Sequence, residues 1–138
     1  MATSRLSSRM RRVFQTTVTL TGAAGAGAQG TVAVATTTGA VMVHSVGAYC
    51  STSLAGATAT IELGVANDTA ELIAQTTATD IDAGEVWESA TPDEGVTLVT
   101  SKAIAGNIIL TVATADITAG VLKIAIEYTP LTTDGYLA

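Results

Sequence analysis

Apolar residues recur at every second position in a series of short segments along this 138-residue chain. Within residues 13–21, for example, Phe14, Val18 and Leu20 fall on one face, while Gln15 and the neighbouring threonines fall on the other. Side chains alternate between two faces along a β-strand, so a period of two predicts a strand with one buried face.

The same alternation predicts further strands, separated by turn residues. The expected strands are 31–37, 41–50, 57–63, 70–76, 96–101, 107–114 and 121–129. In the last of these, Leu122, Ile124 and Ile126 are expected to point inward, together with Tyr128. Residues 22–30 contain four glycines, which is too many for a helix interior, and they predict a flexible loop.

This series of strands predicts an all-β protein, a single β-sandwich with a basic N-terminal arm. A jelly roll of about eight strands fits the strand count best. An immunoglobulin-like sandwich is the alternative, although the Cys, Trp, Cys spacing of true immunoglobulin domains is absent. We expect two parts, the arm (residues 1–12) and the β-sandwich domain (residues 13–138).

The composition predicts a thin core. Aromatic residues make up only 4% of the chain, and alanine supplies much of the apolar content. A buried alanine contributes about 2.4 kcal/mol less than a buried leucine, at about 0.8 kcal/mol per missing methylene. We therefore expect the domain to gain stability by packing against copies of itself or against a larger surface.

Charge is divided unevenly along the chain. Residues from 13 onward hold two lysines and all twelve acidic residues, a formal charge of −10. An acidic body argues against nucleic acid as a specific ligand, and four arginine–phosphate contacts would give a salt slope of only about −3.6. The arm is either a solvated tail or an anchor for an acidic protein surface. The expected anchor residues are Arg5, Arg9, Arg11, Arg12 and Phe14.

No residue pattern indicates catalysis, and we expect no enzyme and no cofactor. Cys50 is the one cysteine and is expected to be a buried, inert thiol, compatible with a reducing compartment. His44 is the one histidine, and its neighbour Ser45 points to the opposite face of the predicted strand. A nucleophile–base pair is therefore not expected, and His44 is interpreted as a half-buried structural residue.

Metal, phosphate and targeting motifs are also incomplete. The acidic stretch 80–85 does not match the EF-hand template, because Glu85 occupies the position that requires glycine. A weak, non-EF-hand ion site formed by this stretch with Glu88 is the alternative. The glycine-rich segment has no Gly-Lys-Ser/Thr and predicts no phosphate loop. No secretory signal is visible, and no apolar run is long enough to span a bilayer. The Arg/Ser-rich start also resembles a mitochondrial presequence.

Three features carry a resemblance to a known class of proteins. They are the Ala/Thr/Val/Gly-biased strands with few aromatics, the turn and strand over 115–124, and the ending 126–131 followed by 133–136. Over about the last two thirds of its length, the chain resembles the small bacteriophage capsid decoration or cement proteins, which are accessory virion proteins of β-sandwich type.

The resemblance implies a virion structural protein, made in the host cytoplasm, that binds and stabilises the phage head from the capsid surface. The implied partner is the major capsid protein or another virion protein. A homo-oligomer is implied, with a trimer favoured, and neither a membrane nor a specific nucleic acid is expected. Removal of residues 1–12 is expected to leave the fold intact and to abolish attachment.

Other assignments stay open. A phage tail, head–tail or fibre component would have the same sequence character. A shell-forming capsid protein would use the arginines to face its genome, although such arms are usually longer and more basic. A small soluble carbohydrate- or surface-binding jelly-roll module is the alternative from another functional class, and it predicts a monomer with a concave, aromatic face.

Overall fold

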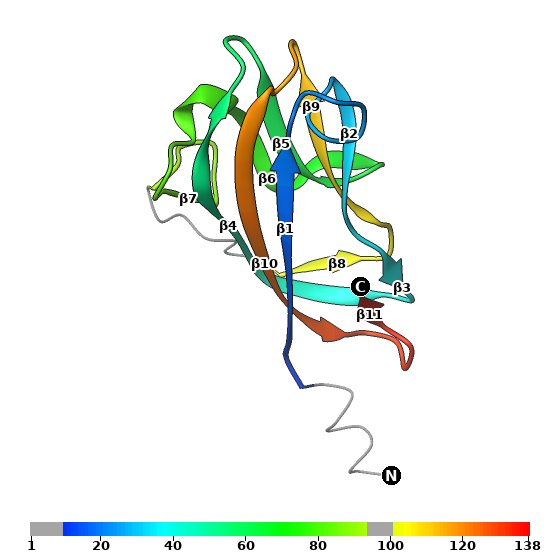
Figure 1. The fold of residues 1–138 in the computed structure, drawn as a ribbon. Coiled ribbons are helices and arrows are strands. Elements are labelled where there is room, and N and C mark those ends of the chain that lie inside the picture. The colour runs from blue at the N-terminus through cyan, green and yellow to red at the C-terminus, as the bar shows by residue number, and fades with distance from the viewer. Residues whose placement is uncertain (1–9, 94–100) are drawn as a thin grey trace.

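The computed structural model describes residues 10–93 and 101–138, and strands with their connecting turns account for nearly all of them (Figure 1). Within these residues the one helical element is the three-residue 3-10 helix η1 (Ala78–Asp80). The prediction of an all-β protein is confirmed. The strands are β1 (Arg12–Leu20), β2 (Gly30–Ala35), β3 (Thr37–Thr38), β4 (Val41–Ala55), β5 (Thr60–Val65), β6 (Asp68–Thr77), β7 (Val86–Trp87), β8 (Lys102–Ile104), β9 (Ile108–Ala113), β10 (Ala119–Pro130) and β11 (Tyr136–Leu137).

The strands form two main antiparallel sheets that enclose a common core in a sandwich-like arrangement (Figure 1). The first sheet has the order β1-β10-β4-β7, and β8 pairs with the first three residues of β4, ahead of the part that pairs with β7. The second sheet has the order β2-β9-β5-β6. A small ribbon of β3 and β11 joins the C-terminus to the chain just before β4.

Strand pairing is nested, so that each pair encloses the next one along the sequence. β1 pairs with β10, β2 with β9, β4 with β7, and β5 with β6. β10 also pairs with β4, with register shifts near both ends of the pairing. These irregularities accompany the strong bend of β4 in Figure 1, because bulges increase local twist and bend a strand.

The predicted alternation is confirmed in the strands that build the core. Leu122, Ile124, Ile126 and Tyr128 of β10 are each at most 2% exposed, whereas the residues between them lie on the outer side. The prediction of a thin, alanine-rich core is wrong, since only four of the 29 buried apolar residues in the described part of the chain are alanine. Leucine, isoleucine and valine supply most of the rest, because the alternation leaves many alanines on the outer positions.

Several predicted boundaries differ from the observed ones. β4 extends to Ala55 rather than to Cys50, and β5 begins only at Thr60 because residues 56–59 form a turn. The short strands β3, β7, β8 and β11 were not expected, because two or three residues are too few to show a period. The strand expected at 96–101 lies almost entirely outside the described residues.

The glycine-rich segment is an ordered turn, so the prediction of a flexible loop is wrong. The N–H groups of Thr21 and Gly22 donate to the carbonyl of Ala26 at 2.7 and 3.0 Å, and Ile117 N–H donates to the carbonyl of Gly27 at 2.7 Å. Gly27 has a φ of +115°, and a Cβ there would lie 2.2 Å from the Ile117 oxygen. Glycine is needed here because the backbone of another turn approaches so closely.

A buried hydrogen bond fixes the largest side chain of the core. Trp87 is fully buried, and its indole N–H donates to the hydroxyl of Thr76 at 2.7 Å. That hydroxyl itself donates to the carbonyl of Ala74 at 2.9 Å. Thr111 provides a contrast, because its buried hydroxyl has no hydrogen-bond partner.

We predict that Thr76→Val destabilises the fold by about 1–3 kcal/mol, because it leaves the buried indole N–H of Trp87 without an acceptor. The matched change Thr111→Val is expected to be neutral or stabilising, since it removes an unsatisfied buried hydroxyl. Urea unfolding followed by tryptophan fluorescence measures both. Equal effects of the two changes would contradict the role given to the Thr76–Trp87 bond.

Candidate functional site

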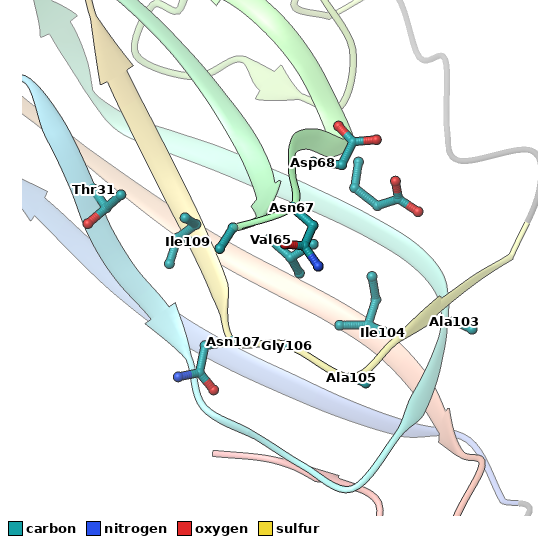
Figure 2. A pocket seen from close by; sticks show the side chains of 12 residues that line it. Thr31, Val65, Asn67, Asp68, Ala103, Ile104, Ala105, Gly106, Asn107 and Ile109 are labelled. Carbon is teal, nitrogen blue, oxygen red and sulfur yellow. The ribbon is translucent and has the colours of Figure 1, made fainter.

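A cavity of about 670 Å³ opens between the β5–β6 turn and the β8–β9 turn (Figure 2). Its apolar lining comes from Val65, Ile104 and Ile109, together with small residues of the second turn. Polar side chains complete it: Thr31, Asn67, Asp68, Glu71 and Asn107. The cavity therefore has an apolar base with amides and carboxyls around it, a lining suited to a polar ligand with hydroxyl or cationic groups.

Local structure positions these polar groups. The β5–β6 turn is tight, since Val65 pairs directly with Asp68, and the Asp68 carboxylate accepts the N–H of Ala70 at 3.2 Å. On the other side, the side-chain oxygen of Asn107 accepts the N–H of Thr37 at 3.0 Å and ties the β8–β9 turn to β3. Asn107 thus has a structural role in addition to its place in the cavity.

Two carboxyl groups of the cavity interact directly. A hydrogen bond to Asp68 raises the pKa of Glu71, and partial burial and the negative charge of Asp68 add to the effect. The positive charge of Lys102 acts in the opposite direction. Glu71 therefore keeps its proton to a higher pH than an isolated glutamate does. Neither histidine nor cysteine is among the residues that line the cavity.

His44 lies on β4 and is half-buried, as predicted. Its Nδ1 is 3.0 Å from the Ser101 hydroxyl, and its Nε2 is 2.7 Å from the Thr129 hydroxyl. Ser45 also occupies an outward position, because the register shift between Glu127 and Tyr128 makes a bulge of β4 between the buried Val43 and Val46. The prediction that His44 and Ser45 point to opposite faces is therefore wrong. Ser45 lines a hollow beside Lys123 and is not a hydrogen-bond partner of His44. Both ring nitrogens are thus engaged by hydroxyl groups that connect three segments of the chain.

Cys50 is fully buried, as predicted. Burial raises the pKa of its thiol, and the nearby charges of Asp82 and Glu85 act in the same direction. The thiol donates a hydrogen bond to the carbonyl of Thr52 at 3.1 Å. Backbone hydrogen bonding at Thr52 lowers the pKa, but by less than burial raises it. A buried thiol with a raised pKa is a poor nucleophile.

In the acidic stretch between η1 and β7, the Glu85 carboxylate stabilises the turn that contains it. Glu85 accepts the N–H of Asp82 at 2.8 Å. In residues 10–93 and 101–138, no group of three or more His, Cys, Asp or Glu side chains is arranged to hold a metal ion.

Three of the five predicted anchor residues lie in the described part of the chain, and their environments differ. Arg5 and Arg9 lie outside the described residues. Arg11 forms an ion pair with Glu127 of β10, and Arg12 is the first residue of β1, opposite Tyr128. Phe14 is partly buried and packs against the core, so it belongs to the sandwich rather than to a free arm. The sheet therefore starts at Arg12, one residue earlier than the expected boundary.

The outer face of the first sheet was not predicted as a site. We use "outer face" for the outward-pointing residues Val13, Gln15, Thr17, Ser45, Gly47, Tyr49, Val86, Glu88, Lys123, Ala125 and Glu127, with Arg11 at its end. It carries hollows of about 240 and 370 Å³, one on each side of Lys123. The alternation had already assigned Lys123, Ala125 and Glu127 to this side. Their grouping with β7 residues required the strand order.

No match was found among protein-family models, curated proteins or solved structures. Among the residues that the structure describes, no helix is long and apolar enough to cross a membrane.

We predict that the Cys50 thiol resists alkylation by iodoacetamide at pH 8 in the native protein and reacts readily in urea. Above the ordinary thiol pKa, the unfolded chain loses a proton that the folded chain retains, so the free energy of unfolding falls as pH rises. The variant Cys50→Ala is expected to lack this part of the pH dependence. Mass spectrometry measures the labelling, and rapid labelling of the native protein would contradict the assignment.

For the carboxyl pair, Asp68→Ala is expected to bring the pKa of Glu71 down towards its ordinary value, since both the hydrogen bond to Asp68 and its negative charge are removed. Lys102→Met is expected to raise that pKa further. Carboxyl carbon shifts followed by NMR during a pH titration measure both changes. If the Glu71 pKa does not change in either variant, the pair does not interact.

Proposed function

We propose that this protein is a virion structural protein, a decoration or cement protein that binds and stabilises a phage head. The observation that carries the proposal is the separation of charge. Four arginines fall within the first twelve residues, ahead of a body with a formal charge of −10. β1 is the edge strand of its sheet and continues directly from this basic segment. Such a segment suits attachment to an acidic protein surface.

We also propose that the sandwich is an eight-stranded jelly roll. The strands β1, β2, β4, β5, β6, β7, β9 and β10 form two four-stranded antiparallel sheets, and nested pairing of this kind is what a rolled-up long hairpin gives. In a constant-type immunoglobulin sandwich the first two strands are neighbours in one sheet. Here β1 and β2 belong to different sheets, which favours the jelly roll.

The proposed partner is the major capsid protein or another virion protein. Many copies on a repeating lattice let weak single contacts give firm attachment, through avidity. A homo-oligomer belongs to the same proposal, and the resemblance to decoration proteins favours a trimer. A tail, head–tail or fibre component is the rival within the virion class, because the same charge separation would suit it.

The second candidate is a soluble carbohydrate-binding module, which the cavity between the β5–β6 and β8–β9 turns favours. Its carboxyl and amide groups are of the kind that bind sugar hydroxyls. Against this function, no aromatic side chain lines the cavity, and the exposed Tyr49 and Tyr136 lie elsewhere.

We predict that replacing Arg5, Arg9, Arg11 and Arg12 together by glutamine leaves the fold intact and weakens attachment to particles at least about tenfold, because the charge-complementary contacts are lost. Cosedimentation with particles stripped of this protein measures attachment. Lys102→Gln is the control, since it removes a positive charge from a different part of the surface. Attachment of the arginine variant at full affinity would contradict the anchor.

The copy number in purified particles tests the function itself. Quantitative mass spectrometry of particles from the producing cells is expected to find copies in the hundreds, near parity with the shell protein. A handful of copies per particle would favour the tail or neck instead. Complete absence from particles, combined with binding to a glycan array, would favour the carbohydrate-binding module.

A further inference from the structure

The outer face of the first sheet differs in charge from the rest of the molecule. Arg11 and Lys123 balance Glu88 and Glu127 on this face, so its formal charge is zero. Outside it, the described residues contain nine acidic residues against Lys102 and Arg12. Two copies that meet through this net acidic remainder bring like charges together, whereas two copies that meet through the outer face do not.

The outer face is also partly apolar. Val13, Tyr49 and Val86 are 61%, 47% and 36% exposed, and they are three of the six large apolar side chains that the described residues expose. Ser45, Gly47 and Ala125 lie between them and leave a hollow of about 370 Å³. Figure 1 shows the strands that carry these residues side by side, in the order β1, β10, β4 and β7.

Two opposite charges line this hollow without pairing. Lys123 lies opposite Tyr49 on β4, whereas Glu88 lies over Gly47, where an added Cβ would be 3.1 Å from its carboxylate. Within residues 10–93 and 101–138 the one salt bridge is Arg11–Glu127, so Lys123 and Glu88 form none there. If a second copy is rotated by 180° about a two-fold axis, its cation faces the anion of the first copy, and its anion faces the cation.

We propose that the outer face binds a second copy of this chain around a two-fold axis, with Lys123 of each copy against Glu88 of the partner copy. The exposed rings and methyl groups of Tyr49, Val13 and Val86 then pack over the small residues of the opposite hollow. This pairing gives each unpaired charge a partner and covers the apolar residues of the face together.

The size of the face sets the expected strength of the contact. A nine-residue strand is roughly 30 Å long, and four strands about 4.8 Å apart are about 20 Å wide. The face can therefore bury at most about 600 Å² per copy, at the low end of the interfaces that form specific complexes. A reversible dimer is expected, populated at tens to hundreds of micromolar.

This inference rests on the homo-oligomer in the proposed function but replaces the trimer by a pair. A face that packs against itself closes with two copies, whereas a trimer joins two different surfaces. Copy number in particles tests the virion function independently, so the two proposals can fail separately.

The test is sedimentation velocity of the full-length chain from about 10 µM to about 1 mM, the range of weak interfaces. Lys123→Glu and Glu88→Lys each place like charges against each other in a pair, and each is expected to weaken dimerisation at least about tenfold. Lys102→Glu changes the charge equally on another part of the surface and is expected to have a much smaller effect. Circular dichroism verifies that each variant is folded.

Mixing the two single variants gives the sharpest result. In a mixed pair, the two introduced side chains have opposite charges and face each other, and the native Glu88 of one copy faces the native Lys123 of the other. A heterodimer is therefore expected to form although each variant alone is monomeric. A wild-type monomer at about 1 mM, a trimer, equal effects of Lys123→Glu and Lys102→Glu, or a mixture that stays monomeric would each overturn the proposal.

Discussion

The pairing of β10 with both β1 and β4 is the interaction on which the rest of the structure depends. It joins the two ends of the chain and places the β10 residues Leu122, Ile124 and Ile126 in the middle of the core. A shift by one residue would turn this row outward and bring Lys123 inward, so burial fixes the register. The paired residues are also far apart in the sequence, and such long-range contacts predict slow folding of the kind seen in β-sandwiches.

The same register determines what the molecule presents to its surroundings. Since leucine, isoleucine and valine take the inward positions, small and polar residues are left outside, and Gly47 and Ala125 form a shallow hollow in the first sheet. The alanine-rich composition is therefore largely a surface property.

Local pattern was enough to predict the class of fold and the inward residues of β1 and β10, because alternation depends only on neighbouring positions. It could not predict the two-residue strands or the closed turn at Gly27, whose hydrogen bond to Ile117 joins segments about ninety residues apart. The cavity and the outer face were missed for the same reason. Their residues come from strands that are distant in the sequence and become neighbours only in the folded sheet.

The two proposed contacts of this acidic protein, attachment through the basic segment and pairing through the outer face, differ in their electrostatics. A basic segment approaching an acidic partner is attracted over roughly 10 Å at 0.1 M salt, and added salt weakens that attraction. Two copies of the body repel one another, and added salt weakens this repulsion while it also screens the Lys123–Glu88 pairs between them. Self-pairing should therefore depend on salt much less than attachment does. If both weakened equally as salt rose, the contact between copies would depend on the basic segment rather than on the outer face of the sheet.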